Sequence, residues 1–345
     1  MTLRVLVAGG AGYIGSHMVK ALLEAGHAVV TLDDFSTGGR PELAGETIVR
    51  GSIGDAALVG SVLERGRFDA VMHFAARSIV GESMRDPALY WQNNVAAGLA
   101  LLEQMRQHGP ARLVFSSTAA VYGDPGAGPV PESHPCAPVN PYGQSKLAFE
   151  RALADYQAAY GLESVRLRYF NAAGAHPGGE LSEQHDPETH LIPLVLQTAA
   201  GLRGPLSIFG DDYPTPDGTC VRDYVHVCDL AGAHLLALQR LLAGGGSATF
   251  NLGNSRGFSV REVLDAARAV TGLPIPYEIR GRRPGDPPIL VSDSARARRE
   301  LGWQPRYESL EDIIATAWRA FRPAISGAAP RPARPGALGI SPSAV

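Results

Sequence analysis

A tyrosine and a lysine four residues apart are the first pair in this sequence that could carry out acid–base chemistry. Residues 141–146 read PYGQSK, and Pro141 suits the first turn of a helix, so Tyr142 and Lys146 should lie one turn apart on one face. On this spacing alone, a surface tyrosine packed against a lysine stem is the commoner arrangement. The functional alternative is a phenol whose pKa falls from about 10 toward neutrality beside the ammonium, so that it acts as a base.

Three glycines in the segment AGGAGYIGSH, residues 8–17, predict a dinucleotide-binding turn. The spacing is Gly9-x-x-Gly12-x-x-Gly15, directly after an apolar strand and before an amphipathic helix. In such a turn one glycine permits the tight bend, one lets the backbone approach a pyrophosphate, and one permits close helix–strand packing. The phosphates then lie at the helix N-terminus, where N–H groups and the helix dipole favour negative charge.

Asp33 is predicted to select the adenosine end of the dinucleotide. It ends the next apolar run, 18 residues after Gly15, where a carboxylate binds the ribose hydroxyls. A carboxylate at this position repels a 2′-phosphate, which favours NAD over NADP. Arg40 lies close enough downstream to keep NADP as an alternative.

The composition is that of an ordinary soluble globular protein. The chain has 345 residues, of which 45% are hydrophobic and 19% charged, and its net charge of −3 does not suggest a nucleic-acid or membrane partner. The first residues run into a strand and have no signal-peptide pattern, and no apolar stretch is long enough to span a membrane. The three cysteines, Cys136, Cys220 and Cys228, fit neither a disulfide framework nor a zinc motif. A reduced, cytoplasmic protein is therefore expected.

Strand and helix patterns alternate over the first half of the chain. The apolar runs LRVLVAG, AVVTLDD, DAVMHFAA, ARLVFSST and SVRLRYF are separated by helical patterns. Continuous apolar runs suit strands buried on both faces, so the alternation predicts an α/β fold with a parallel sheet covered by helices. After about residue 170 the alternation is less regular.

The glycine spacing and the Tyr-x-x-x-Lys pair together resemble the extended short-chain dehydrogenase/reductase family. Two longer segments, SIFGDDYPTPDGTCVRDYVHVCDL and RRPGDPPIL, are similar to the UDP-glucose 4-epimerases of that family, and the likeness covers about residues 3–320. The matching segments are HFAARSIVGES (73–83), NNV (93–95), SSTAAVYG (116–123), RYFNAAGAHP (168–177) and the two longer ones at 207–230 and 282–290.

This resemblance implies a Rossmann-type doubly wound parallel sheet with a smaller C-terminal, substrate-binding α/β domain. The NAD-binding domain would comprise residues 1–170, with about 219–255 returning to it. Residues 171–218 and 256–322 would bind the UDP-sugar. Residues 323–345, rich in Pro, Ala and Gly, are expected to form a disordered tail.

The implied reaction interconverts UDP-galactose and UDP-glucose through transient oxidation of C4 to a ketone. Tyr142 would remove the C4 hydroxyl proton, which requires a pKa shift of about 3 units, or about 4 kcal/mol. Lys146 and the positive nicotinamide ring would together supply that shift, and Lys146 would also bind the nicotinamide ribose. Thr118 would hydrogen-bond the C4 oxygen from the carboxyl end of its strand.

The resemblance also implies a residue set for each ligand, with arginines suited to the diphosphate because their planar forks form paired charge-assisted bonds. The NAD set is Gly9, Gly12, Tyr13, Ile14, Gly15, Asp33, Ser52, Ile53, Phe74, Ala75, Ala76, Ser78, Asn93, Tyr142, Lys146 and Phe170. The UDP-sugar set is Thr118, Tyr142, Asn171, His190, Leu191, Ser207, Ile208, Phe209, Arg222, Tyr224, Arg283, Asp286 and Leu290.

Three other functions are alternatives to the interconversion of UDP-galactose and UDP-glucose. Nucleotide-sugar 4,6-dehydratases carry an Asp-Glu pair where this chain has Ala119 and Ala120, so dehydration lacks its acid. Leu290 stands where a bulky tyrosine excludes N-acetylated sugars, which leaves an epimerase of UDP-N-acetylhexosamines or UDP-pentoses as an alternative. A non-catalytic NAD-binding regulator is also open, although Thr118, Tyr142 and Lys146 argue against it.

The sequence predicts no metal site. The family resemblance does predict a homodimer. His176, His185 and His190 share a loop region but lack ligand spacing supported by cysteines or by carboxylates on a defined face. The family resemblance implies that two copies associate through residues 86–107 and 141–160.

Overall fold

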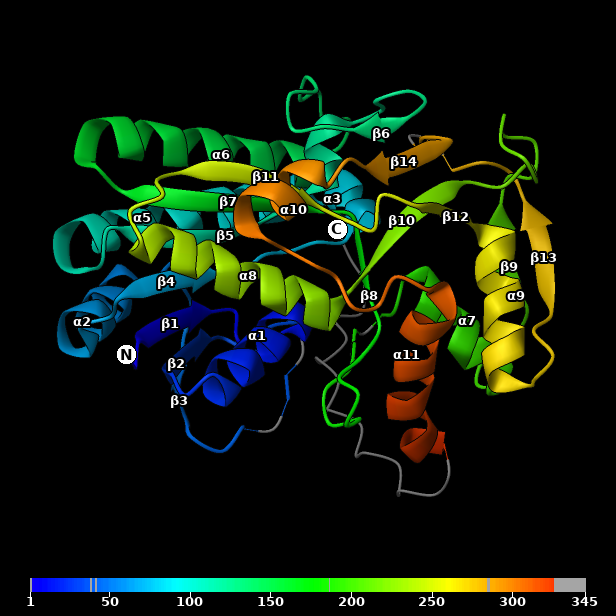
Figure 1. Cartoon of the computed structure of the whole chain (residues 1–345), viewed down its shortest axis with the longest axis horizontal. Helices are drawn as coiled ribbons and strands as arrows, with labels where there is room; N and C mark the ends of the chain where they lie inside the picture. The colour runs from blue at the N-terminus through cyan, green and yellow to red at the C-terminus, as the bar shows by residue number, and fades with distance from the viewer. Residues whose placement is uncertain (1, 38, 41, 186, 284–285, 326–345) are drawn as a thin grey trace, which may run out of the picture.

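The computed structural model describes residues 2–37, 39–40, 42–185, 187–283 and 286–325, which form a large lobe and a smaller one (Figure 1). The large lobe is built on a seven-stranded sheet with strand order β11-β7-β5-β4-β1-β2-β3, in which all neighbouring strands are parallel. Its strands are β1 (Arg4–Ala8), β2 (Ala28–Asp33), β3 (Glu46–Arg50), β4 (Ala70–His73), β5 (Arg112–Thr118), β7 (Glu163–Tyr169) and β11 (Ala248–Leu252).

Helices cover both faces of this sheet because its central strands are apolar on both sides. In β1, for example, Val5, Leu6, Val7 and Ala8 are all fully buried, with alternate residues in two separate hydrophobic clusters. One cluster includes α1 (Tyr13–Glu24) and α8 (Val227–Leu242), and the other includes α2 (Ala56–Gly66), α5 (Ala97–His108) and α6 (Pro141–Tyr160). The predicted Rossmann-type fold is therefore confirmed.

The order of the strands determines where a ligand can bind. The chain runs outward from β1 through β2 to β3, and then returns to add β4 on the other side of β1. The helices that follow β1 and β4 leave a crevice at this switch point, beyond the carboxyl ends of the strands.

The small lobe packs beyond those carboxyl ends. Its core lies among α7 (Leu191–Ala199), α9 (Val260–Thr271) and α11 (Leu310–Ile325), beside the parallel pair β9 (Leu206–Phe209) and β13 (Tyr277–Arg280). A second sheet links the lobes and comprises β6 (Pro129–Val130), β8 (Asn171–Ala173), β10 (Val221–His226), β12 (Gly257–Ser259) and β14 (Ile289–Ser292).

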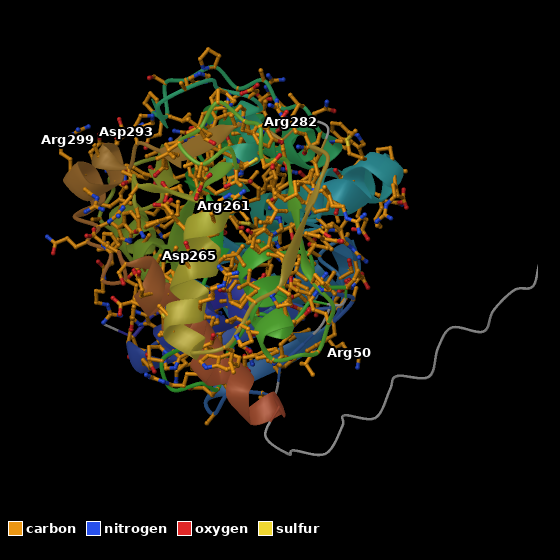
Figure 2. The ribbon with its side chains drawn as sticks, turned by 90° about the vertical axis from the view of Figure 1, so that its right-hand side faces the viewer. Arg50, Arg261, Asp265, Arg282, Asp293 and Arg299 are labelled. Atoms are coloured by element: carbon orange, nitrogen blue, oxygen red, sulfur yellow. The ribbon has the colours of Figure 1, made fainter. Side chains whose placement is uncertain are left out.

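The helix α9 illustrates how sequence pattern and packing agree in this lobe. The Ser259 hydroxyl accepts a hydrogen bond from the Glu262 backbone nitrogen, and the Glu262 carboxylate accepts one from the Ser259 backbone nitrogen, which forms a capping box at the helix start. Val263 and Leu264 are buried in the small-lobe core. Asp265 lies on the side turned toward solvent (Figure 2).

Two details of the segment boundaries differ from the sequence-based division. Within residues 219–255, α8 and β11 pack onto the large sheet, whereas β10 pairs with β8, β12 and β14. The helix α11 extends to Ile325, past the predicted start of the tail, and residues 326–345 lie outside the described residues. In the described part of the chain, no helix combines the length and apolarity that a membrane span requires.

Candidate active site

All the residues predicted for catalysis, cofactor and substrate line one cleft of about 1900 Å³. The cleft begins at the carboxyl ends of β1, β2, β4 and β5 and continues to β9 and β10 of the second lobe. Residues from Gly9 to Leu290 thus meet in one space, although most of them are far apart in the sequence. Their individual roles in binding remain predictions.

The glycine turn between β1 and α1 leaves one open backbone position. Gly9 has φ +81°, and a Cβ added there would lie 2.3 Å from the Ala75 nitrogen. A Cβ on Gly15 would lie 2.0 Å from the Gly9 carbonyl oxygen, so this residue permits the helix to pack against the turn. At Gly12 the nearest atom would be 3.6 Å away, and the residue borders the cleft. The open position and the N-terminus of α1 suit a phosphate group.

Asp33 is held in place by the same turn. Its carboxylate accepts hydrogen bonds from the backbone nitrogens of Ala11, at 2.9 Å, and Phe35, at 2.8 Å. Burial raises the pKa of Asp33, and the two bonds act in the opposite direction. The residue therefore presents a fixed acceptor at the end of β2, where the ribose hydroxyls of a dinucleotide would lie.

Arg40, which kept NADP open as an alternative, is engaged by a buried carboxylate. Its Nη2 donates to Glu46 at 2.9 Å and to the Gly10 carbonyl at 3.1 Å. The Thr31 hydroxyl donates to the same carboxylate at 2.7 Å. Because the guanidinium already neutralises Glu46, its charge is largely satisfied within the protein, which favours NAD over NADP.

The catalytic pair predicted from PYGQSK begins the long helix α6. Asn140 caps the helix by accepting from the Gly143 nitrogen at 2.9 Å, and Pro141 occupies the first turn. A Cβ on Gly143 would lie 2.4 Å from the Ala120 carbonyl oxygen, so the helix start packs closely against the residues after β5. This packing brings Tyr142 within hydrogen-bonding contact of Thr118.

In the protein without cofactor, the pKa of Tyr142 is raised rather than lowered; the lowering expected with the nicotinamide ring in place stays a prediction. Desolvation raises the pKa of this phenol above its ordinary value, and the hydrogen bond with Thr118 offsets only part of that rise. Lys146 is buried, and its Nζ donates to the Ser116 carbonyl at 2.8 Å and lies 4.8 Å from the centre of the Phe115 ring. Burial lowers the pKa of Lys146 to about 7, against the opposing effect of Glu150. The lysine is thus only partly charged at neutral pH, which weakens its effect on the tyrosine.

A buried polar network beneath Lys146 was missed by the sequence analysis. Glu150, one turn further along α6, accepts hydrogen bonds from the Ser117 hydroxyl and from Arg168. Arg168 also donates to the Tyr122 hydroxyl at 3.0 Å, and that hydroxyl donates to Asn251 at 2.7 Å. The network connects α6 with β5, β7 and β11, so it fixes the position of the helix that carries the catalytic pair. The position of Glu150 four residues after Lys146 was the available signal.

Asn94 is a second residue that the sequence analysis did not single out, although it belongs to the NNV segment. It lies in a π-helical turn, η1 (Trp91–Ala96), a form of helix that is common at functional sites. Its buried amide exchanges hydrogen bonds with the backbone of Arg77 and donates to Ser145 at 3.0 Å. Asn94 therefore connects the loop after β4 to α6.

The residues predicted to bind the UDP group of the substrate lie at the small-lobe end of the cleft. Arg222 and Leu290 are directly paired on β10 and β14, and an Arg222 nitrogen lies 3.8 Å from the Asp286 carboxylate. The Arg283 guanidinium stacks 3.9 Å from the centre of the Phe209 ring. Two guanidinium groups and an aromatic ring therefore border the same space.

In the loop before α7, two glutamate carboxylates lie beside the histidines. These contacts were not predicted from the sequence. The Nδ1 atom of His190 lies 2.9 Å from Glu183 and 3.0 Å from Glu188. Burial lowers the pKa of His190, but these two carboxylates outweigh it and raise the pKa to about 10. His176 pairs instead with Glu180, at 3.0 Å. The prediction that these histidines lack supporting carboxylates was therefore wrong for His190.

Comparison with known proteins identifies the family. Residues 5–253 match the NAD dependent epimerase/dehydratase family. The chain is 52% identical over 314 residues to a UDP-glucose 4-epimerase of Halalkalibacterium halodurans, covering 91% of this chain and 94% of the relative. It is 53% identical over 321 residues to that of Streptomyces lividans, covering 92% and 96%. The solved UDP-glucose 4-epimerase of Brucella ovis, in complex with NAD, is 48% identical with a TM-score of 0.90, covering 93% and 98%. The chain therefore belongs to the NAD dependent epimerase/dehydratase family.

Proposed function

We propose that this chain interconverts UDP-galactose and UDP-glucose by inverting C4 of the sugar, with NAD as its cofactor. The observation that carries the proposal is the meeting of Thr118, Tyr142 and Lys146 on the wall of a cleft that also holds the glycine turn. The relatives named UDP-glucose 4-epimerase, about half identical over nine tenths of the chain, support the same function.

The glycine turn and Asp33 would hold the cofactor. The backbone at Gly12 is open to the cleft, and the Asp33 carboxylate lies at the end of the neighbouring strand. The buried Lys146 would bind the nicotinamide ribose. When bound, NAD would supply the hydride acceptor for oxidation of C4 and, in its reduced form, the hydride donor for reduction of the ketone.

Tyr142 would act as the base for the C4 hydroxyl, with Thr118 orienting the oxygen through the hydrogen bond that connects the two residues. In the protein alone this phenol is a weak acid, so its ionisation requires added positive charge. The nearby Lys146 has a pKa of about 7 and gains that charge readily when ribose hydroxyls bind its ammonium form. The base would therefore be active mainly in the filled site.

Arg222 and Arg283 would clamp the diphosphate and leave the sugar free to turn. Guanidinium groups suit this task because each donates two parallel charge-assisted hydrogen bonds. Ser207, Ile208 and Phe209 would line the uracil pocket.

A UDP-N-acetylhexosamine is the second candidate substrate, and Leu290 is the observation that favours it. This side chain borders the cleft and packs against the hydrophobic cluster that includes Phe170, where it takes less space than a tyrosine would. A Campylobacter jejuni enzyme named UDP-Glc/GlcNAc 4-epimerase is 41% identical, with a TM-score of 0.81, covering 93% of this chain and 99% of that one. A UDP-pentose epimerase and a non-catalytic regulator are further alternatives.

The first experiment is to incubate the purified protein with UDP-galactose, without added NAD, and to measure UDP-glucose by chromatography. Conversion would establish epimerisation with a cofactor retained through purification. Conversion only after NAD is added would support the function with a loosely held cofactor. With neither result, UDP-N-acetylgalactosamine and a UDP-pentose are tested next, and inactivity on all of them refutes the proposal.

We also propose that the protein acts in the cytoplasm as a homodimer. The dimer contact would include residues 86–107 and 141–160, where Trp91 and Tyr160 remain 41% and 57% exposed. The free state of all three cysteines is compatible with a reducing compartment. Light scattering after gel filtration measures the mass, and a monomer at micromolar concentration would contradict the dimer.

A further inference from the structure

Two histidines and two glutamates before α7 point their ligand atoms toward one another. We propose that Glu183, His185, Glu188 and His190 form a binding site for a divalent transition-metal cation, with zinc as the best-fitting ion. The test of this site does not depend on the proposed epimerisation, because zinc binding is measured directly and no proposed catalytic residue belongs to the cluster, although His190 is also in the predicted UDP-sugar set.

The distances within the cluster are those of a metal site. One ligand atom from each of the four residues lies within 4.8 Å of the other three. Glu183 Oε1 is 2.9 Å from His190 Nδ1 and 3.1 Å from His185 Nδ1, and Glu188 Oε2 is 3.8 Å from His185 Nδ1. Four ligands at zinc–ligand distances of about 2.0 Å around a tetrahedral ion would be about 3.3 Å apart. Small side-chain movements would therefore complete the site.

The cluster contains ligand atoms that the protein leaves unsatisfied. The Nδ1 atom of His185 is buried and forms no well-aligned hydrogen bond within the described residues, although the carboxylates of Glu183 and Glu188 lie 3.1 and 3.8 Å away. The Oε1 atom of Glu188 accepts from the backbone nitrogens of Thr189, at 2.7 Å, and His190, at 2.8 Å. These bonds orient the carboxylate and leave Oε2 available. A buried imidazole nitrogen without a well-aligned hydrogen bond is costly, and a cation held between this nitrogen and the two carboxylates would satisfy it.

Charge favours a cation at this position. The side chains of Glu183 and Glu188 are only 8% and 7% exposed, so two carboxylates are withdrawn from water side by side. Zinc would displace the proton that the two carboxylates stabilise on His190. With both histidines then neutral, the four residues carry two negative charges, which a dication balances. The pair of imidazoles selects a transition metal, since magnesium and calcium prefer oxygen ligands alone.

The position of the cluster suggests a structural role for the ion. His185 lies edge-on to Tyr13 of the glycine turn, with ring centres 6.5 Å apart, and His190 caps the start of α7. All four residues border the main cleft. A cation bound here would tie this loop together beside the proposed cofactor site, and would neutralise two carboxylates that otherwise repel phosphate groups.

The test is to measure zinc binding directly in protein prepared without a histidine tag. Wild-type protein is compared with His185→Gln, which removes one ligand, and with His176→Gln, which removes a neighbouring histidine that pairs outside the cluster. Each protein is stripped with a chelator, titrated with zinc against a chromophoric competitor, and dialysed for elemental analysis. Thermal unfolding with zinc and with the chelator gives a second readout, independent of activity.

We expect about one equivalent of zinc in the wild type and in His176→Gln, with a higher unfolding temperature in zinc than in chelator. His185→Gln should bind zinc at least about tenfold more weakly. Failure of the wild type to retain zinc, with the same unfolding temperature under both conditions, would overturn the proposal. In that case the four residues form only an ion-paired cluster around His190. Equal zinc affinity in His185→Gln would also overturn it.

Discussion

Two glycines of the same turn should respond in opposite ways when each is replaced by alanine. At Gly15 the new Cβ would lie 2.0 Å from the Gly9 carbonyl oxygen, and a backbone atom is unable to move aside without distorting the turn. At Gly12 the nearest atom would be 3.6 Å away, and the backbone angles of −75° and 176° are accessible to alanine. Gly15→Ala should therefore destabilise the fold, whereas Gly12→Ala should leave the fold intact and obstruct the phosphate.

The magnitudes follow from these contacts. Overpacking against an immobile neighbour costs about 1–3 kcal/mol, and we expect at least that much for Gly15→Ala. Gly12 is the N-cap of α1, where replacing glycine with alanine typically changes stability by less than about 1 kcal/mol. Gly12→Ala should instead weaken NAD binding by at least about tenfold, because a methyl group occupies the space where the backbone approaches the pyrophosphate.

The assay has to separate stability from cofactor binding, since bound NAD itself stabilises the folded state. Urea unfolding of cofactor-free protein gives the free energy of unfolding, and titration calorimetry gives the NAD affinity. Gly232→Ala, at a glycine of α8 where an added Cβ would meet no atom within 4 Å and which does not line the cleft, serves as the control for the substitution itself, with stability expected to be unchanged or higher because alanine favours a helix. Unchanged stability of Gly15→Ala, or unchanged NAD affinity of Gly12→Ala, would refute the roles assigned to these two glycines.

Four further outcomes are expected. Tyr142→Phe should lower kcat by about 10²–10⁴ while NAD still binds, as measured by initial rates and cofactor content. Leu290→Tyr should reduce turnover of UDP-N-acetylgalactosamine by at least about tenfold relative to UDP-galactose, as measured by chromatography, because the larger side chain fills the sugar space. Arg222→Ala should raise KM for UDP-galactose by about tenfold to a hundredfold through the loss of charge-assisted bonds, as measured by steady-state kinetics. Burial lowers the pKa of His73 and of His226 to about 3, so both remain neutral in the folded protein and take up protons on unfolding below pH ~6.5. Stability should be complete above that pH and fall by up to about 1.4 kcal/mol per pH unit for each histidine during acidification toward pH 4, as measured by urea unfolding.

Each of these outcomes has a contrary result that is easy to recognise. An unchanged rate for Tyr142→Phe would exclude this phenol as the base. If Leu290→Tyr reduces turnover of UDP-galactose and of UDP-N-acetylgalactosamine equally, the side chain supports the fold and does not select the substrate. A fall in kcat alone for Arg222→Ala would contradict a diphosphate contact made in the ground state. A flat stability profile between pH 6.5 and 4 would show that the buried histidines do not control acid unfolding.

Features encoded in short segments were predictable. The glycine turn, the carboxylate at the end of β2 and the first turn of α6 depend on residues within about twenty positions of one another, and their geometry follows from backbone sterics and capping. The alternation of apolar runs with helical patterns likewise predicted the parallel sheet, because strands buried on both faces need apolar side chains at successive positions. These features determined the fold class and the type of cofactor site.

Charge states were decided by the tertiary structure. The spacing of Tyr142 and Lys146 suggested a tyrosine of lowered pKa, but folding desolvates both residues and directs the ammonium toward the Ser116 carbonyl. Arg40 was open as a ligand for a 2′-phosphate until the fold paired it with the buried Glu46. In both cases the sequence identifies the charged groups, whereas the pKa and the available partner depend on which distant atoms exclude or replace water.

The sequence by itself determined that this chain has a dinucleotide-type turn, a helical tyrosine–lysine pair and an α/β sheet, because each is encoded by local spacing. Only the tertiary structure joined the arginines of the small lobe to that site, paired Glu150 of α6 with Arg168 of β7, and brought Glu183 and Glu188 against His190. Loops and chain crossovers bring these distant residues into contact. The paths of the loops depend on how the whole core packs, and no periodic sequence pattern predicts them.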